Sequence, residues 1–328
     1  MSSDCAMLAP RGSRECAVSV VVPVYNEEAV LAAFHRRLAA VLGAIDACSE
    51  VLYVDDGSSD ATSEILASLR TADPSVSTIR LSRNFGKEVA MSAGLRLARG
   101  SAVVLMDADL QDPPELIPSM LLCWRNGADV VNMRRRSRGG ESWLKRATSH
   151  AFYRVINRLS DVPVPRDVGD FRLLSRRAVD ALNELPERNR FMKGLFAWIG
   201  YRQATIDYDR ARRAAGQSKW QYWRLWNFAI EGITGFSIAP LKAATYLGLA
   251  SALGAFAFAL YFLVKTLAAG DPVAGFPTLI VTILFLGGMQ LIALGVLGEY
   301  VGRLSTESRR RPLYLIDEYL PARIHEPA

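Results

Sequence analysis

Two long uncharged segments near the C-terminal end place the strongest constraint on the fold. Residues 243–264 and 276–297 each run for about 22 positions without a charged side chain, which is long enough to cross a hydrocarbon core of about 30 Å as an α-helix. The linker between them, 265–275, is short. The pair is therefore predicted to form a helical hairpin in a membrane, and a folded domain must come from the residues before it.

The charges that flank these segments predict their orientation. Lys242 precedes the first segment, and Arg303, Arg309, Arg310 and Arg311 follow the second. Positively charged flanks stay on the cytoplasmic side. Both termini are expected in the cytoplasm, in a multi-pass protein of the inner (plasma) membrane. The segments contain almost no ionisable side chain, so a transport pathway through one chain is not expected.

The first part of the chain alternates between two hydrophobic patterns. Short apolar runs rich in β-branched residues predict strands at 17–24, 51–55, 78–81, 102–107 and 130–133, and periodic patterns predict helices at about 27–45, 61–69, 87–98 and 114–126. This alternation predicts an α/β fold with a parallel sheet covered by helices on both faces. Ligands bind beyond the carboxyl ends of the strands in such sheets, so chemistry is expected in the loops there.

The end of the fourth predicted strand carries the strongest local signal. Asp107 and Asp109 follow an apolar run two positions apart, where both carboxylates can face the same side as a strand ends. Such a pair suits Mg²⁺ or Mn²⁺, with diphosphate oxygens and water as the remaining ligands. The ion would stabilise a departing nucleoside diphosphate. Gln111 adds a polar group at the same rim. An Asp-x-Asp pair is also common on loop surfaces, so both interpretations stay open at this point.

Two more acidic loops follow neighbouring strands. After the first strand, Tyr25 can stack on a base and Glu27 can accept hydrogen bonds from ribose hydroxyls; after the second, Asp55 can accept from a base N–H. Each loop alone is also explained as a strand-to-helix turn. Three acidic loops at successive strand ends favour one nucleotide-binding crevice. The sequence has no G-x-G-x-x-G or G-x-x-x-x-G-K-[ST] motif, which argues against dinucleotide cofactors and P-loop chemistry.

Basic residues later in the chain can hold a second phosphate. Arg134 lies in a run of three arginines, Asp170 and Arg172 form an Asp-Phe-Arg stretch, and Arg213 and Lys219 precede the membrane segments. A charge run is usually a solvated face, but its position between domain and membrane favours binding of a lipid phosphate. The net charge of +6 is interpreted in the same way, as fitting an anionic membrane surface or phosphate-bearing substrates rather than nucleic acid.

Two segments predict contact with the membrane surface. Residues 143–159 and 220–236 combine apolar faces, tryptophans and basic side chains, as in helices of the headgroup layer. Packing of 143–159 on the domain core or on another subunit explains its pattern equally well. The four cysteines form no C-x-x-C pair and share no metal-ligand spacing with the histidines, so reduced cytoplasmic thiols are predicted. Residues 1–16 lack the apolar stretch of a signal peptide.

Several motifs together carry a family resemblance. They are 22–28 (Val-Pro-Val-Tyr-Asn-Glu-Glu), 82–88 (Ser-Arg-Asn-Phe-Gly-Lys-Glu), 107–114 (Asp-Ala-Asp-Leu-Gln-Asp-Pro-Pro), 169–173 (Gly-Asp-Phe-Arg-Leu), 190–194 (Arg-Phe-Met-Lys-Gly) and 216–220 (Gly-Gln-Ser-Lys-Trp). Over about residues 17–312 the chain resembles family 2 glycosyltransferases of the GT-A fold. Within them it is most similar to polyprenyl-phosphate glycosyltransferases that glucosylate bactoprenol (undecaprenyl phosphate), which are related to dolichyl-phosphate mannose synthases.

This resemblance implies a Rossmann-like GT-A nucleotide-sugar domain, amphipathic interface helices, two C-terminal transmembrane helices and a homotetramer. The expected divisions are an N-terminal tail (1–16), a cytoplasmic transferase domain (17–219), a juxtamembrane helix (220–240), a transmembrane hairpin (241–300) and a cytoplasmic C-terminal tail (301–328).

The resemblance also implies roles for individual residues. Pro23, Tyr25, Glu27, Asp55 and Asp107 would bind the nucleotide; Asp107 and Asp109 the metal; Gln111, Arg134, Arg213 and Lys219 the donor or acceptor phosphates; and Asp109, Asp170 and Arg172 would be catalytic.

The implied reaction is an inverting transfer of a hexose, first of all glucose from UDP-glucose, to undecaprenyl phosphate, which supplies a lipid-linked sugar for cell-surface glycan modification. A phosphate monoester has a second pKa of about 6, so this acceptor is mostly dianionic at neutral pH. Asp170 is therefore expected to organise the arginines rather than to abstract a proton.

Other functions compete with this one. N-acetylglucosamine, mannose, galactose or modified arabinose could replace glucose. A processive polysaccharide synthase uses the same fold, but its Q-x-x-R-W motif is only approached at 221–225, where Leu225 stands in place of Trp. A non-catalytic scaffold is a third hypothesis, against which the three acidic loops argue.

Overall fold

The structure is a computed structural model that describes residues 16–45, 47–136, 168–187, 190, 192–209, 239–269 and 275–323. The chain divides into two compact units. The first comprises Met1–Tyr153, Val162–Trp220 and Pro312–Ala328, and the second comprises Arg154–Asp161 and Gln221–Arg311. The segments 143–159 and 220–236, together with Arg213 and Lys219, lie outside the described residues, so those predictions stay predictions.

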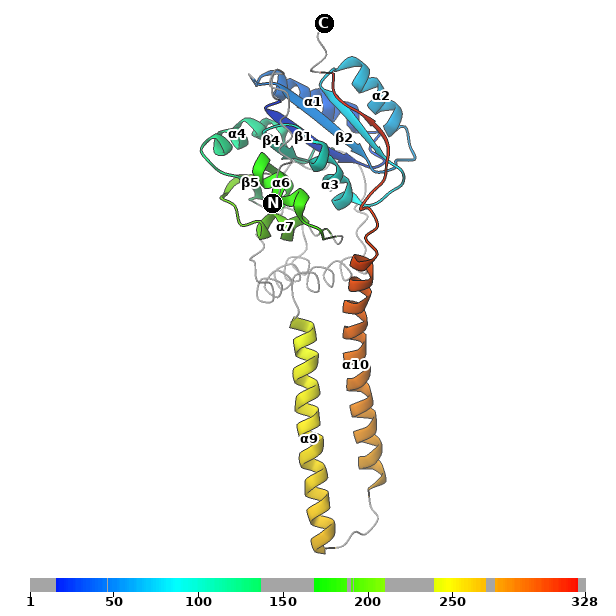
Figure 1. The fold of residues 1–328 in the computed structure, drawn as a ribbon. Coiled ribbons are helices and arrows are strands. Elements are labelled where there is room, and N and C mark those ends of the chain that lie inside the picture. The colour runs from blue at the N-terminus through cyan, green and yellow to red at the C-terminus, as the bar shows by residue number, and fades with distance from the viewer. Residues whose placement is uncertain are drawn as a thin grey trace, which may run out of the picture. The chain divides into compact units, whose positions relative to one another are not determined.

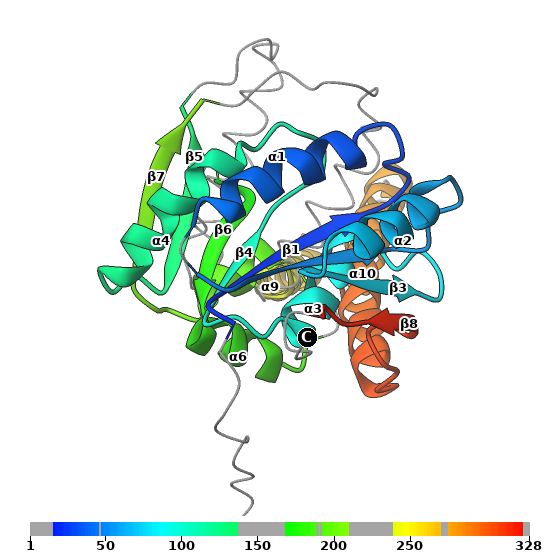
Figure 2. The ribbon, with the colours of Figure 1, turned by 90° about the horizontal axis from the view of Figure 1, so that it is seen from above.

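The first unit is built on a sheet of eight strands in the order β7-β5-β6-β4-β1-β2-β3-β8 (Figure 2). The strands are β1 (Val18–Val24), β2 (Ser49–Asp55), β3 (Val76–Leu81), β4 (Ala102–Leu105), β5 (Val130–Arg135), β6 (Val168–Ser175), β7 (Gln203–Tyr208) and β8 (Ile316–Leu320). The central strands β1, β2 and β4 are almost wholly buried, and β1 and β4 are mostly apolar, as expected for parallel strands covered on both faces.

Helices cover both faces of this sheet. They are α1 (Leu31–Gly43), α2 (Thr62–Ala72), α3 (Lys87–Leu97), the 3₁₀ turn η1 (Pro114–Leu116), α4 (Ile117–Arg125), α6 (Arg176–Glu184) and α7 (Met192–Trp198). Leu31, Phe34 and Leu38 of α1 belong to the same core cluster as Val20 of β1. On the other face α3 packs closely, since a Cβ on Gly94 would lie 2.3 Å from Val21 Cγ1. The predicted α/β layers are confirmed.

The prediction of a parallel sheet is wrong in part, because the sheet is mixed. Strands β1, β2, β3 and β4 are parallel to one another, but β6 is antiparallel to both β4 and β5, and β8 is antiparallel to β3. Strand β6 carries Asp170 and Arg172, which interrupt its apolar pattern, and it follows β5 only after a long stretch of chain. No local pattern therefore indicated it.

The segment 301–328, expected as a tail, also contains ordered structure. Helix α10 runs on to Ser308, and β8 extends the sheet at the edge of β3. Backbone contacts secure it: Ser82 N donates to Leu315 O at 3.0 Å, and Ala322 N donates to Ser77 Oγ at 2.8 Å. The side chains of β8 are mostly exposed, so backbone pairing rather than a hydrophobic pattern defines this strand.

The second unit contains two long helices, α9 (Ala239–Ala269) and α10 (Phe276–Ser308), drawn in Figure 1. Ser251 Oγ of α9 donates to Met289 Sδ of α10 at 2.8 Å. Within the described residues, one window, Phe285–Gly302 in α10, is long and apolar enough to cross a membrane, with a mean hydropathy of 1.4 and none of it buried. The apolar stretch in α9, Ala244–Phe258, is shorter, so the second membrane span stays a prediction.

Candidate active site

Pairing between β4 and β6 brings two separate acidic stretches together. Leu105 lies opposite Arg172 in this antiparallel pair. Two residues onward from Leu105 comes Asp107, and two residues back from Arg172 comes Asp170. The two carboxylates consequently face each other at the edge where β4 ends, as expected for a ligand site of this fold class.

Lys87 lies between these carboxylates. Its ammonium nitrogen is 2.6 Å from Asp107 Oδ1 and 2.8 Å from Asp107 Oδ2, and it donates to Asp170 Oδ2 at 2.5 Å. The Lys87 side chain is 40% exposed, against 23% for Asp107 and 18% for Asp170. The bridging ammonium joins the residue predicted to hold the donor metal to the residue predicted to organise the acceptor.

The loop before Lys87 is held in place by Asp56. This buried carboxylate accepts from Phe85 N at 2.7 Å and from Gly86 N at 2.9 Å. Gly86 precedes α3 with φ +100°, a conformation that a side chain disfavours. Gly57, with φ +70°, allows the two loops to approach, since its Cβ would lie 2.7 Å from the carbonyl carbon of Arg83. The position of Lys87 is thus set by the backbone.

Electrostatic interactions between Lys87 and its two carboxylate partners favour the charged forms of Lys87 and Asp170. Burial opposes the ammonium form of Lys87, but Asp107 and Asp170 more than offset it, so the pKa of Lys87 is raised. Burial opposes ionisation of Asp170 too, but the charges of Lys87 and Lys193 and the Lys87 hydrogen bond outweigh it, so the pKa of Asp170 is lowered. Asp170 is thus an anion that holds cations, and it is poorly suited to accept a proton near neutral pH.

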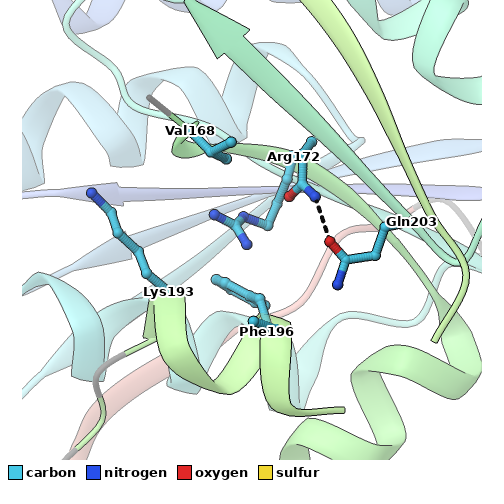
Figure 3. A pocket seen from close by; sticks show the side chains of 7 residues that line it. Val168, Arg172, Lys193, Phe196 and Gln203 are labelled. Atoms are coloured by element: carbon cyan, nitrogen blue, oxygen red, sulfur yellow. Dashed lines mark hydrogen bonds between the residues drawn. The ribbon is translucent and has the colours of Figure 1, made fainter. Parts of the chain in front are cut away.

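Arg172 packs against Phe196 of α7 and lines a small pocket. It is 2% exposed, its Nη2 donates to Gly169 O at 2.7 Å, and its guanidinium lies 3.7 Å from the ring centroid of Phe196. Figure 3 shows Lys193 and Gln203 around the same pocket. Burial lowers the pKa of Arg172 to about 10, which still leaves it charged at neutral pH. This side of the site is rich in cations.

Glu88 connects α3 to α7. Its Oε2 accepts from Met192 N at 3.1 Å, at the first residue of α7. Burial first, and then repulsion by Asp170, raises the pKa of Glu88 to about 7. Since α7 carries Lys193 and Phe196, this contact helps to hold the helix that borders Arg172.

The second aspartate of the predicted metal pair, Asp109, begins a tight turn. Its Oδ1 accepts from Gln111 N at 3.1 Å, and Leu110 between them has φ +61°. Within the described ranges no group of three or more His, Cys, Asp or Glu side chains could hold a metal by itself. Two carboxylates fit an ion that takes its other ligands from a diphosphate and water. Gln111 is buried at the same rim.

The loops predicted to hold a nucleoside are connected to each other. Tyr25 is 41% exposed after β1. Glu27 N donates to Thr62 Oγ1 at 3.0 Å. Asp55 accepts from Ser58 N at 2.9 Å and from Ser63 Oγ at 2.7 Å, so its carboxylate connects the end of β2 to the first turn of α2. These contacts bring the β1 and β2 loops together at one edge. Pro23 lies within β1 beside Val54.

Two neighbouring arginines of β5, the predicted Arg134 and Arg135, have different partners. Arg134 pairs with Asp207 at 2.6 Å on the exposed side of β7. Arg135 is partly buried and contacts Tyr208. Burial opposes its charge, but Tyr208, Asp112 and Asp107 outweigh it and raise its pKa. Neighbouring residues of a strand point to opposite faces, so a run of three arginines could not decide this without the strand's register.

Sequence reasoning missed Lys87 and Arg135 as site residues. Lys87 stands in the motif 82–88, so its place in that motif was an available signal. Arg135 could be found only by knowing which side chains of β5 point to the same face of the sheet.

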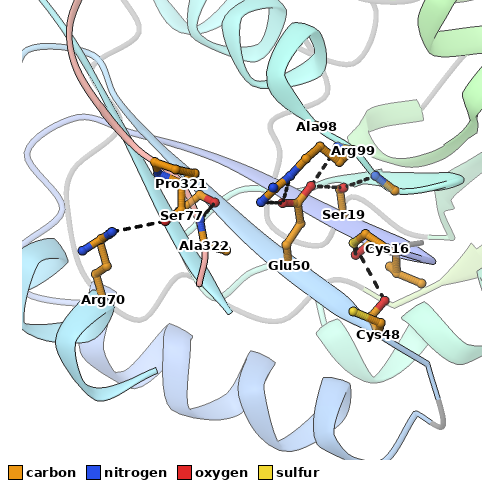
Figure 4. A network of polar contacts seen from close by, with 12 residues as sticks. Cys16, Ser19, Cys48, Glu50, Arg70, Ser77, Ala98, Arg99, Pro321 and Ala322 are labelled. Atoms are coloured by element: carbon orange, nitrogen blue, oxygen red, sulfur yellow. Dashed lines mark hydrogen bonds and ion pairs between the residues drawn. The ribbon is translucent and has the colours of Figure 1, made fainter. Parts of the chain in front are cut away.

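The buried carboxylate of Glu50, at the opposite end of the strands, provides a contrast with the candidate site (Figure 4). It is fully buried near the amino ends of β1 and β2, where it accepts from Ser19 Oγ at 2.6 Å and from Arg99 N at 2.8 Å. Arg99 also pairs with it through its guanidinium at 3.0 Å. Both oxygens are satisfied by the protein, which indicates an anchor for the loop between α3 and β4.

Comparison with known proteins agrees with this geometry. The model of "Glycosyl transferase family 2" matches residues 19–182. An uncharacterised glycosyltransferase of Synechocystis sp. is 50% identical over 309 residues, which cover 93% of this chain and 97% of that protein. A bactoprenol glucosyl transferase of Shigella phage SfV is 46% identical over 91% of this chain and 97% of its own. A prophage bactoprenol glucosyl transferase homologue of Escherichia coli (strain K12) is 44% identical, with coverages of 91% and 98%.

The mixed α/β domain, the acidic edge of its sheet and these similarities define a nucleotide-sugar transferase of the GT-A type. The chain belongs to glycosyltransferase family 2.

The raised pKa of Glu88 predicts a pH dependence of stability. A carboxyl whose folded pKa, about 7, exceeds its ordinary value of 4.5 favours folding below the lower value, and this contribution is lost as the pH rises through about 7. Glu88→Gln keeps an oxygen for Met192 N but does not ionise. The melting temperature of Glu88→Gln in detergent, relative to the wild type, should therefore increase from pH 5.5 to pH 8. A difference that stays constant with pH, with the exposed Glu64→Gln measured beside it as a control, would contradict this prediction.

Proposed function

We propose that the protein transfers glucose from UDP-glucose to undecaprenyl phosphate with inversion at the anomeric carbon. The observation that carries the proposal is the cluster of Asp107, Lys87 and Asp170, which joins a predicted donor site to a cation-rich acceptor site. The printed function of the phage and prophage relatives, 44–46% identical over 91% of the chain, supports glucose and bactoprenol as the substrates.

The donor lies along the β1, β2 and β4 edge in this proposal. Tyr25 and Glu27 contact the nucleoside beside Pro23 and Asp55, and Gln111 lies beside the diphosphate. Asp107 and Asp109 would hold Mg²⁺ or Mn²⁺, and the ion would supply positive charge to stabilise the departing diphosphate. Positioning and this electrostatic stabilisation supply most of the rate.

The acceptor phosphate approaches from the side of β6. It is mostly dianionic at neutral pH, with a second pKa of about 6, and its oxygen can attack without a base. Arg172 and Lys193 from the described part of the chain, with Arg213 and Lys219 from outside it, attract this phosphate. Asp170 holds Lys87 and balances these cations, which agrees with its lowered pKa.

This assignment predicts different effects for two aspartates. Asp109→Asn should reduce transfer by about 100-fold or more, because charge stabilisation of the leaving group is lost. Asp170→Asn should cost less, because an amide can still accept from Lys87 but no longer balances its charge. Transfer is measured with purified full-length protein in detergent, undecaprenyl phosphate, Mn²⁺ and a panel of UDP- and GDP-sugars.

The pH profile provides the control for this ranking. Wild type and Asp170→Asn should both lose rate below about pH 6, where the acceptor becomes protonated. A larger loss in Asp170→Asn than in Asp109→Asn, with the pH dependence abolished, would show Asp170 to be the base. If a lipid-linked product forms from a donor other than UDP-glucose, the sugar of that donor takes the place of glucose in the proposal.

We also propose that α9 and α10 both span the membrane and that the protein is a homotetramer. The uncharged segments 243–264 and 276–297 and the basic residues after α10 support a cytoplasmic location for both termini. The tetramer rests on the family resemblance.

The topology is tested by cysteine labelling. A cysteine placed at Asp271, in the linker between the helices, should react with a membrane-impermeant maleimide in intact spheroplasts. Arg310→Cys is the matched control and should react only after lysis. Protection of Asp271→Cys before lysis would exclude the hairpin.

A further inference from the structure

The ammonium group of Lys87 occupies both oxygens of Asp107. Its distances to Oδ1 and Oδ2 are 2.6 and 2.8 Å, so a second cation bound at either oxygen would lie close to the ammonium. Asp107 is also one of the two carboxylates proposed to hold the divalent ion. A divalent ion and an ammonium at such distances repel each other strongly, and one must leave before the other binds.

Lys87 has a second anchor to which it can remain attached. Asp170 Oδ2 accepts from it at 2.5 Å, whereas the other oxygen, Asp170 Oδ1, is buried without a hydrogen-bond partner within the described residues. The backbone at Gly86 is held by Asp56, so the lysine can move only through its side-chain torsions. It can leave Asp107 while staying on Asp170.

We propose that Lys87 is a built-in placeholder cation, which occupies the Asp107 half of the metal site until a divalent ion arrives together with a nucleoside diphosphate. The inference rests on the proposed function, because it takes Asp107 as a metal ligand. A metal ion that binds alone must displace the ammonium from Asp107 without giving it a new anionic partner, so it binds weakly. Metal with a diphosphate brings phosphate oxygens, which give the displaced ammonium a new anionic partner. Lys87 is thus a positioning residue that couples metal binding to donor binding.

The coupling is reciprocal by thermodynamic necessity. If UDP increases the affinity for Mn²⁺ by some factor, Mn²⁺ increases the affinity for UDP by the same factor. The placeholder therefore disfavours a site loaded with metal alone.

The test measures Mn²⁺ binding to the full-length protein in detergent by the loss of the free-ion paramagnetic resonance signal, with and without UDP. In wild type, UDP should strengthen Mn²⁺ binding. Lys87→Met should bind Mn²⁺ alone about tenfold tighter or more, because the competing charge is gone. The strengthening by UDP should shrink in this variant.

Two further variants separate this mechanism from a general charge effect or from misfolding. Lys193→Met removes an equal charge that also acts on Asp170, but no contact with Asp107 accompanies it, so its affinity for Mn²⁺ alone should change less than threefold. Asp170→Asn leaves Lys87 with Asp107 as its one carboxylate partner in the described site, so Mn²⁺ alone should bind more weakly than in wild type. Damage to the fold cannot produce shifts in opposite directions.

The placeholder role is overturned if Lys87→Met binds Mn²⁺ alone no tighter than wild type, if neither protein binds Mn²⁺, or if Lys193→Met shows the same gain. The transfer assay is independent of this readout. If the wild type forms glucosyl lipid but Lys87→Met does not change Mn²⁺ binding, the placeholder role is excluded and the proposed function remains. If Lys87 competes with Mn²⁺ but no glucosyl lipid forms, the placeholder role remains and the proposed transfer reaction is excluded.

Discussion

The antiparallel pairing of β6 with β4 is the constraint on which the site depends. It places Asp170 opposite Asp107, although the two residues are far apart in the sequence. Two carboxylates that contact the same side chain would repel each other without a cation between them. Lys87, in the first turn of α3, provides that cation. The end of β4, strand β6 and the start of α3 thereby each contribute one residue to the same charge cluster.

The loops around this cluster are held by bonds that the protein makes to itself. Asp56 holds the backbone before Lys87, Asp55 accepts from the Ser63 hydroxyl of α2, and Glu88 holds the start of α7. Such preorganisation lowers the reorganisation needed when charged substrates bind. Several acidic residues near the carboxyl ends of the strands thus support the loops of the candidate site.

Glu50 and Asp170 differ in how the protein satisfies their charges. Glu50 has protein partners on both oxygens and anchors the amino ends of β1 and β2. Asp170 keeps one buried oxygen unpaired within the described structure. A buried polar atom without a partner is costly, and it is tolerated where a ligand can satisfy it. This difference, rather than burial alone, distinguishes the structural carboxylate from the candidate catalytic one.

Periodicity and motifs in the sequence determined the layered α/β domain, the acidic loops after β1, β2 and β4, and the long apolar helices, because these signals are local. Tertiary structure decided what depends on contacts between distant segments. Pairing along β5 gave Arg134 and Arg135 different partners, backbone pairing made β8 an edge strand, and β6 entered the sheet antiparallel. The place of Lys87 between Asp107 and Asp170 was likewise decided there, since a bridge across three elements leaves no periodic trace in any one of them.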